Sequence, residues 1–225
     1  SNDAETTPEQ PPTPALSTIT LTTSEHKKAE AGDAIAQYNL ALQLEADGKL
    51  TKAADMYQKA ADQNQTEAQY NLGYAFFEGK GLPQSDVNAA LWFQKAADQG
   101  LDVAQHMMGF LYEKGDRGVP QDYAKATDWY RKAAEQGLAI AQTALGQKYQ
   151  FGKGVGKDLK EAAKWYRKAA EQGHAIAQLK LGIMRLIGQG VPKDDKEAAE
   201  LIRKAAEQGE AMAQYTLGVL YAKGL

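Results

Sequence analysis

The sequence predicts an all-α protein, a solenoid of five helix-pair repeats followed by a half repeat. Two recurring motifs carry this prediction. An Ala-Gln pair begins at positions 36, 68, 104, 141, 177 and 213, and a Lys-Ala-Ala triplet begins nine residues before each of the last five pairs. A period of about 36 residues is typical of stacked helix pairs, in which each pair buries its apolar face against the next. Because the spacing from triplet to pair is constant, all variation in length falls in one loop per repeat, which we expect to be exposed.

The first 27 residues differ in composition from the rest of the chain and are expected to form a Thr/Pro-rich flexible segment. Residues 1–24 contain no aromatic side chain and show no helical period. Such a stretch cannot bury enough apolar surface to offset its ordering entropy. Residues 15–21 nevertheless carry three apolar side chains among threonines. We therefore expect them to dock as an extended strand in a groove, either that of the same chain or that of a neighbouring copy.

The first helix of each repeat carries the motif Ala-Gln-x-x-Leu-Gly. Its glycine lies in the middle of the helix, where glycine costs about 1 kcal/mol relative to alanine. This cost recurs at Gly73, Gly109, Gly146, Gly182 and Gly218. We expect another helix to cross at each of these positions so closely that no Cβ fits.

The second helix carries Trp-Tyr-x-Lys-Ala-Ala or a close variant. It is expected to start after an N-cap Ser or Asp and to end before a glycine, or before Asn64 in the first repeat, since these residues tolerate the left-handed backbone. Three tryptophans share one helical phase and are expected to fill the core between helix pairs; they are Trp92, Trp129 and Trp165. The expected N-caps are Ser85, Asp122, Asp158 and Asp194.

These motifs, together with the loop Gly-x-Gly-Val-Pro-x-Asp, resemble those of the Sel1-like repeat family, a relative of the tetratricopeptide repeats. The resemblance covers residues 31–224 and implies a right-handed α-α superhelix whose first helices line the concave face. It implies repeats at about 31–64, 65–100, 101–137, 138–173, 174–209 and 210–225, within one domain of residues 28–225. Repeat 1 departs from the pattern with a short turn at residues 48–50. Repeat 5 departs with Arg185, which stands where other repeats have Phe or Tyr and puts the packing of that helix in question.

Composition argues against several classes of function. The formal net charge is −3, so neither nucleic acid nor an anionic membrane is expected as the main partner. The chain has 0 cysteines, which excludes disulfides, cysteine–metal sites and a thiol nucleophile. No apolar run approaches the roughly 18 residues that span a bilayer. The histidines are too scattered for a metal cluster, so we expect no metal, no cofactor and no catalytic residue.

Two short motifs resemble catalytic ones. Ser24-x-x-Lys27 matches the Ser-x-x-Lys of penicillin-binding enzymes, but neither Ser-Asp-Asn nor Lys-Thr-Gly follows it. Residues 152–157 evoke a phosphate-binding loop, but they lack its first glycine and the Ser or Thr after the lysine. A non-catalytic role is therefore predicted. Because some relatives in the family carry a beta-lactamase label, an amide hydrolase is kept as one alternative, and a self-assembling structural protein is another.

A helical projection of the first helix predicts the binding surface. Positions two and six after the motif alanine face away from the expected core and are mostly apolar or aromatic. An exposed apolar stripe of this kind usually marks a partner site. The sequence favours equally the alternative that neighbouring first helices bury part of the stripe. The expected protein-binding residues are Tyr38, Tyr70, Asn71, Tyr74, His106, Phe110 and Gln147.

Together these features predict an adaptor that binds a peptide or an extended protein segment on its concave face. Homo-oligomers could form through the N-terminal segment or through the sixth half repeat. A Thr/Pro-rich leader before a folded body is the usual composition after a removed signal peptide. The predicted location is therefore periplasmic or secreted in a bacterium, and a disordered cytoplasmic arm is the alternative.

Overall fold

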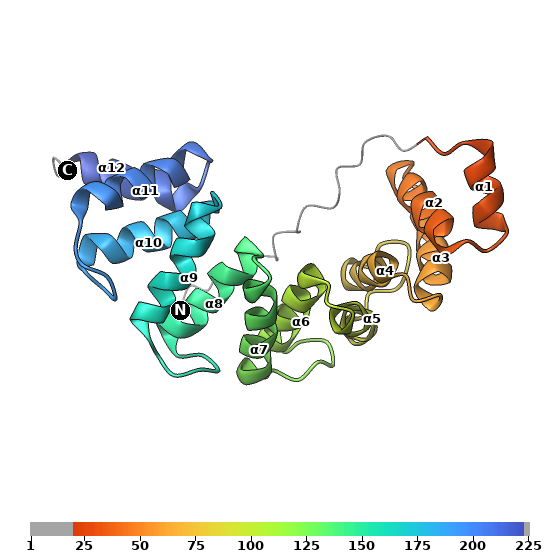
Figure 1. The fold of residues 1–225 in the computed structure, drawn as a ribbon, viewed down its shortest axis with the longest axis horizontal. Coiled ribbons are helices and arrows are strands. Elements are labelled where there is room, and N and C mark those ends of the chain that lie inside the picture. The colour runs from red at the N-terminus through yellow and green to blue at the C-terminus, as the bar shows by residue number, and fades with distance from the viewer. Residues whose placement is uncertain (1–19, 223–225) are drawn as a thin grey trace. The chain divides into compact units, whose positions relative to one another are not determined.

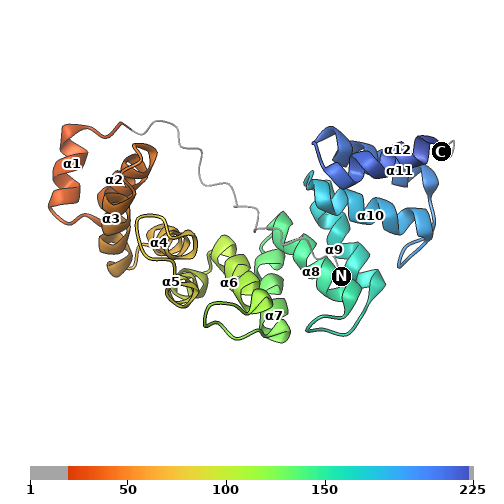
Figure 2. The same cartoon turned by 180° about the vertical axis from the view of Figure 1, so that it is seen from behind.

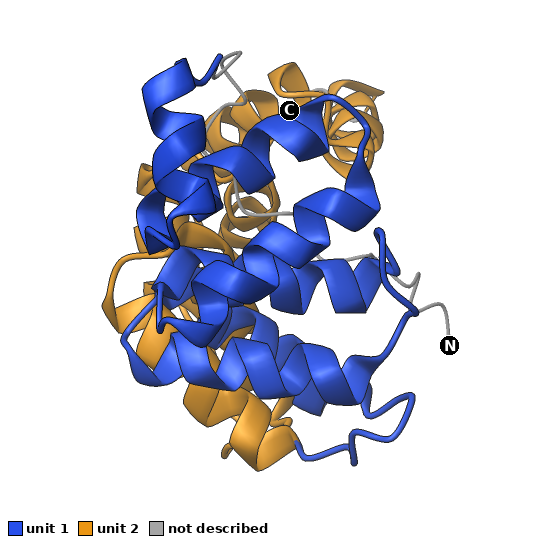
Figure 3. Cartoon of the chain, turned by 90° about the vertical axis from the view of Figure 1, so that its right-hand side faces the viewer, with its two compact units in different colours: residues 1–122 blue, residues 123–225 orange. Residues whose placement is uncertain are grey.

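A computed structural model of the chain describes residues 20–222, and within that range it contains twelve helices and no strand. The predicted all-α class is confirmed. Two compact units make up the chain, residues 1–122 and 123–225 (Figure 3). A single domain over residues 28–225 therefore stays a prediction. The eleven helices expected in the repeats are present as α2 to α12 (Figure 1).

Each unit is a succession of helices in which every helix packs on the next one along the chain (Figures 1 and 2). The most extensive packing joins the first and second helix of one repeat, as between α4 and α5 or between α10 and α11. Unit 1 holds α1 (Thr23–Glu30), α2 (Ala34–Ala46), α3 (Leu50–Asp62), α4 (Thr66–Glu78), α5 (Asp86–Asp98) and α6 (Asp102–Lys114). Unit 2 holds α7 (Tyr123–Glu135), α8 (Ala139–Phe151), α9 (Leu159–Glu171), α10 (Ala175–Ile187), α11 (Asp195–Glu207) and α12 (Ala211–Ala222).

Helix ends follow the capping residues that the sequence predicts. The side chains of Ser85, Asp158 and Asp194 accept hydrogen bonds from backbone N–H groups in the first turns of α5, α9 and α11. These bonds satisfy donors that have no partner inside the helix. After the second helices, Asn64 has φ +66° and the equivalent glycines have φ between +88° and +103°. The left-handed backbone conformation therefore explains why Asn or Gly occupies this position.

Gly73, Gly146 and Gly182 mark close helix crossings, as expected, but the expectation is wrong at Gly218, where no described atom lies within 4 Å of the position of a Cβ. A Cβ at Gly73 would lie 2.8 Å from the Phe93 ring, and one at Gly146 would lie 2.7 Å from the Tyr166 ring. A Cβ at Gly182 would lie 2.7 Å from Ile202. In each case the contacting side chain comes from the second helix of the same repeat. The two helices can lie this close together only because glycine has no side chain at the crossing.

The glutamine of the Ala-Gln motif links three helices, a role that the sequence alone does not reveal. In all six repeats its Nε2 donates to a backbone carbonyl near the end of the preceding helix, at 3.1 to 3.3 Å; this is α1 for the first repeat and a second helix for the others. In at least four repeats its Oε1 also accepts a hydrogen bond from the glutamine that caps the following second helix, at 2.7 to 2.9 Å. Because a buried amide is costly unless it is hydrogen-bonded, the motif fixes the register of neighbouring helices.

Helix α1 lies partly in the segment expected to be flexible, so that expectation is wrong from Thr23 onward. The Thr22 side chain and Glu25 form a capping box at its start. Its Ala29 is buried, and the Ala29 carbonyl accepts the hydrogen bond of Gln37. Leu21 is buried too, and its N–H donates to Oε1 of Gln43 on α2. Residues 1–19, which include most of the segment expected to dock as a strand, lie outside the described residues.

The three tryptophans of the second helices differ in how deeply they are buried. Trp92 and Trp165 are buried as predicted, and Trp129 is half-buried. The lysine three residues after each tryptophan lies over its ring, at 3.8 to 4.3 Å from the ring centroid.

Arg185 does not disturb α10, because it donates to the Pro192 carbonyl at 3.1 Å and pairs with Glu197 at 2.9 Å. It thereby joins the loop of repeat 5 to α11.

Candidate protein-binding surface

The side chains two residues after the motif alanine are mostly buried. Tyr70 is 6% exposed and His106 is 4% exposed, so the expectation that they face away from the core is wrong. Thr143 and Leu179 are buried as well, Tyr38 is half-buried, and only Tyr215 on α12 is largely exposed. For this position the structure follows the alternative interpretation, in which neighbouring helices cover the stripe.

Packing on two sides explains the burial of Tyr70. Helix α4 contacts both α3 and α5, so less of its circumference faces solvent than a projection of one helix suggests. The Tyr70 ring lies 5.6 Å from Phe93 on α5 and 6.3 Å from Tyr74 on α4. Burial raises the pKa of the Tyr70 hydroxyl, with a smaller contribution from Tyr74, so the hydroxyl stays protonated. Among the described residues this hydroxyl has no hydrogen-bond partner.

The remaining predicted residues of unit 1 are partly exposed and lie on its three first helices. Tyr38 comes from α2, Asn71 and Tyr74 from α4, and Phe110 from α6. The buried Phe77 connects Tyr74 with Phe110, since its ring lies 6.1 Å from Tyr74 and edge-on to Phe110 at 5.9 Å. We call Tyr38, Asn71, Tyr74 and Phe110 the aromatic surface. The seventh predicted residue, Gln147, is half-buried on α8 of unit 2 and is not part of this surface.

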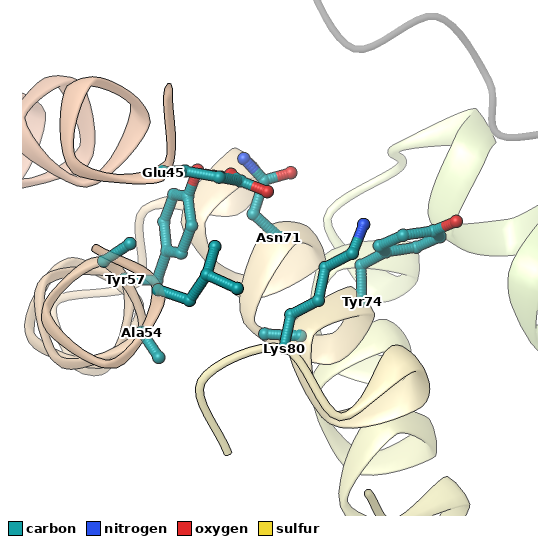
Figure 4. Close-up of a pocket in the computed structure, with 9 residues that line it drawn as sticks. Glu45, Ala54, Tyr57, Asn71, Tyr74 and Lys80 are labelled. Carbon is teal, nitrogen blue, oxygen red and sulfur yellow. Dashed lines mark hydrogen bonds between the residues drawn. The ribbon is translucent and has the colours of Figure 1, made fainter. Parts of the chain in front are cut away.

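A small cavity of about 20 Å³ lies beside Asn71 and Tyr74 (Figure 4). On one side the buried Tyr57 hydroxyl donates a 2.7 Å hydrogen bond to Oε2 of Glu45. On the other side Nζ of Lys80 lies 5.4 Å from the centroid of the Tyr74 ring. The projection that selected Asn71 and Tyr74 misses Glu45, Tyr57 and Lys80, because these belong to the end of α2, to α3 and to the loop after α4.

The electrostatics of this cavity keep its tyrosines protonated. Burial raises the pKa of Tyr57, and the Glu45 carboxylate raises it further. Burial, together with Glu78 and Glu45, raises the pKa of Tyr74 to about 12. Tyr57 therefore donates to Glu45 at neutral pH. Tyr74 keeps its hydroxyl proton, and with Asn71 and Lys80 it offers hydrogen-bond donors next to apolar rings. Such an edge suits a polypeptide that presents both carbonyls and apolar side chains.

The motifs that resemble catalytic ones lie in simple structural contexts. Ser24 and Lys27 are both exposed on α1. In the run 152–157, Gly154 has φ +75°, and a Cβ there would collide with the Tyr123 carbonyl, so this glycine serves the packing of the loop. Within residues 20–222 no three His, Cys, Asp or Glu side chains are grouped so as to hold a metal ion. None of the helices in that range has the length and apolar character of a membrane span.

Comparison with known proteins adds a family and two similar structures. The family model described as Sel1 repeat matches residues 34–65, 66–101, 102–138, 139–174, 175–210 and 211–225. No curated protein matches the chain.

The chain is 38% identical, with a TM-score of 0.85, to the crystal structure of c5321, described as a protective antigen of uropathogenic Escherichia coli strains with an SLR fold. It is 36% identical, with a TM-score of 0.76, to a Sel1 repeat protein from Oxalobacter formigenes. These alignments cover 90% and 87% of this chain. They cover only 44% and 58% of the two related chains, so this chain spans about half of their length.

Proposed function

Because the chain belongs to the Sel1 repeat family, whose members generally serve as protein–protein interaction scaffolds, we propose that it is a non-catalytic adaptor that binds an extended protein segment. The binding site is the aromatic surface of unit 1. The observation that carries the proposal is the repetition of partly exposed aromatic side chains on three first helices of one unit, which are Tyr38, Tyr74 and Phe110.

The chemistry of this surface supports an extended polypeptide as the ligand. Aromatic rings provide large contact areas at a low entropic cost, and Asn71 can pair with a peptide group. Lys80 and Glu45 supply opposite charges at the neighbouring cavity. If helices are spaced by about 10 Å, three first helices would accommodate roughly six to nine residues of an extended strand at about 3.3 Å per residue.

A periplasmic or secreted location in a bacterium belongs to the same proposal. The Thr/Pro-rich composition of residues 1–24 supports it. The similarity to a protein described as a protective antigen is compatible with such a location.

The test uses peptides selected from a random-sequence library against the full chain. We expect the Tyr74→Ser/Phe110→Ser double variant to bind the selected peptides at least tenfold more weakly, which corresponds to about 1.4 kcal/mol. Leu91→Ser is the matched control, because Leu91 is 53% exposed but lies on the second helix α5. It should bind like the unchanged chain.

Two results would overturn the proposal. One is a library that yields no binding peptide, and the other is a set of peptides that bind the double variant and the unchanged chain equally. Circular dichroism melts check that both variants remain folded. Hydrolysis of nitrocefin by the purified chain, lost in Ser24→Ala, would instead favour the amide hydrolase.

A further inference from the structure

The described part of unit 1 carries an excess of acidic side chains. Residues 20–122 contain 15 Asp or Glu and 9 Lys or Arg, whereas residues 123–222 contain 11 Asp or Glu and 16 Lys or Arg. The formal net charge of −3 for the whole chain therefore conceals an acidic unit 1 and a basic unit 2. Because the aromatic surface belongs to unit 1, the charge of its surroundings bears on which polypeptide it binds.

Carboxylates surround the tyrosines of the aromatic surface. Glu45, near the end of α2, lines the cavity next to Tyr74 (Figure 4), and Glu78 follows Tyr74 by one turn of α4. Burial raises the pKa of the Tyr38 hydroxyl, and the carboxylates of Glu67 and Glu45 raise it further. Three carboxylates from two first helices therefore act on the tyrosines of this surface.

Two of these carboxylates have no cation at contact distance. Within residues 20–222 neither Glu45 nor Glu78 forms an ion pair, although Lys80 lines the same cavity as Glu45. One oxygen of Glu45 accepts the 2.7 Å hydrogen bond from Tyr57, and in that range of residues its other oxygen accepts none. The two negative charges are therefore available to a cation of a ligand.

The chain itself shows how aromatic rings hold a cation. In three second helices Nζ of a lysine lies over a tryptophan ring, at 3.8 to 4.3 Å from the ring centroid. Over the Tyr74 ring, Nζ of Lys80 is more distant, at 5.4 Å. The attraction between a cation and a ring is effective within about 6 Å, so Lys80 is held only weakly. A cation of a ligand can replace it on the ring.

The size of the cavity places this cation on the surface. A volume of about 20 Å³ accommodates about one water molecule and no amino-acid side chain. The cation of a ligand therefore lies over the Tyr74 ring, at the mouth of the cavity. The other residues of the aromatic surface remain accessible beside it, because Tyr38, Asn71 and Phe110 are each partly exposed.

We propose that the aromatic surface selects a basic extended peptide, with a lysine or arginine side chain that lies over Tyr74 and pairs with Glu45 or Glu78. This inference rests on the function proposed above and adds the chemistry of the partner. A basic peptide is attracted by the ring and by the carboxylates together. An acidic peptide would gain the cation of Lys80 but would be repelled by the same carboxylates.

The experiment uses three fluorescent pools of nine-residue peptides as probes and the full chain as the receptor. All pools have random uncharged residues at seven positions, and positions 3 and 7 are Lys in the first pool, Gln in the second and Glu in the third. Fluorescence anisotropy should show that the Lys pool binds at least tenfold more tightly than the Glu pool, with the Gln pool between them.

Variants of the receptor then remove the carboxylates. Glu45→Gln/Glu78→Gln should weaken binding of the Lys pool at least fivefold and leave the Gln pool unchanged. Glutamine fits the position of Glu45, because Gln150 occupies the equivalent position of α8 and accepts a 2.7 Å hydrogen bond from Tyr166. Asp98→Asn is the matched control, since Asp98 is an exposed carboxylate of unit 1 on the second helix α5. It should leave binding unchanged.

The sign of the effect of Lys80→Gln separates a basic from an acidic ligand. This variant removes the cation that competes for the Tyr74 ring, so it should strengthen binding of the Lys pool at least twofold. The proposal is overturned if Lys80→Gln weakens binding of the Lys pool, or if the variant without the two carboxylates binds that pool normally. Circular dichroism melts check that the variants are folded.

The remaining outcomes concern the other occupants and the function itself. Tighter binding of the Glu pool would assign the surface to an acidic peptide. A dimer of the chain that Glu45→Gln/Glu78→Gln dissociates in sedimentation would assign the carboxylates to a second copy. Equal binding of the three pools would overturn the selectivity for a basic peptide but leave the adaptor function standing, whereas no binding by any pool would overturn both.

Discussion

At the scale of single residues, unit 1 contains an ion pair between the buried Asp86 and Arg117. Asp86 is the first residue of α5 and is 1% exposed, and within residues 20–222 neither of its carboxylate oxygens has a hydrogen-bond partner. Nη1 of Arg117 lies 3.4 Å from Oδ1 of Asp86. Arg117 reaches this position from a left-handed backbone conformation with φ +46° in the loop after α6. The pair thus joins this loop to the start of α5.

The charges of this pair predict a pH-dependent stability. Burial raises the pKa of Asp86, whereas Arg117 and Lys114 lower it. A carboxyl group whose pKa is higher in the folded than in the unfolded state destabilises the fold once pH exceeds the unfolded pKa. This cost disappears as pH falls below that value. Removing Arg117 should raise the pKa of Asp86 further and enlarge the cost at neutral pH.

We expect Arg117→Gln to lower the free energy of unfolding at pH 7 by about 1 to 3 kcal/mol, the usual cost of leaving a buried polar group without its partner. Near pH 3, where unfolded aspartate is protonated, the loss should be much smaller. Urea unfolding followed by tryptophan fluorescence at both pH values measures the difference. Adding Asp86→Asn should restore most of the stability at pH 7, and an equal loss at both pH values would contradict the electrostatic explanation.

Single residues of the candidate site also show which exposures a sequence alone predicts correctly and which it does not. A helical projection identifies the side of α4 that faces α5, but it treats every other direction as solvent. Tyr70 and His106 were therefore predicted to be accessible, although a helix inside a stack is covered on two sides. Asn71, Tyr74 and Phe110 were predicted and are partly exposed. Glu45 and Lys80 could not be predicted, because they approach Tyr74 only through the tertiary fold.

At the scale of helices, the sequence predicts α2 to α12 from their repeated motifs, and it locates the ends of several second helices from residues with a specific backbone role. An N-cap Ser or Asp and a left-handed Gly or Asn act within a few residues, so they need no tertiary information. Helix α1 was missed because its eight residues include only one buried side chain, Ala29, and show no apolar period. Its capping box of Thr22 and Glu25 was the one local indication, and it precedes no apolar run.

The glycines of the first helices give a matched pair of substitutions. Gly146→Ala should lower stability by about 1 to 3 kcal/mol, since the new Cβ would lie 2.7 Å from the buried Tyr166 ring. Gly218→Ala should raise stability by up to about 1 kcal/mol, because the helix gains a better residue and the Cβ meets nothing. Thermal melts of both variants measure the two changes. A gain in stability for Gly146→Ala would mean that α8 and α9 pack less closely at this crossing than the 2.7 Å distance indicates.

At the scale of the whole molecule, the hydrogen bonds of the motif glutamines make the stability of each helix depend on its neighbours along the chain. Each motif glutamine connects its own helix to the helix before it, and in at least four repeats also to the helix after it. In repeat proteins the stability is close to a sum of such nearest-neighbour terms. A helix with one neighbour should therefore open more readily than one with two.

Hydrogen exchange can test this within unit 2, where α10 packs on both α9 and α11, and α12 packs on α11. Leu181 of α10 is 2% exposed, whereas the equivalent Leu217 of α12 is only partly buried. We expect backbone amides in the middle of α12 to exchange at least tenfold faster than the equivalent amides of α10, a difference of about 1.4 kcal/mol in opening free energy. Equal exchange in α10 and α12 would contradict the nearest-neighbour argument, since it would mean that packing on one helix stabilises α12 as much as packing on two helices stabilises α10.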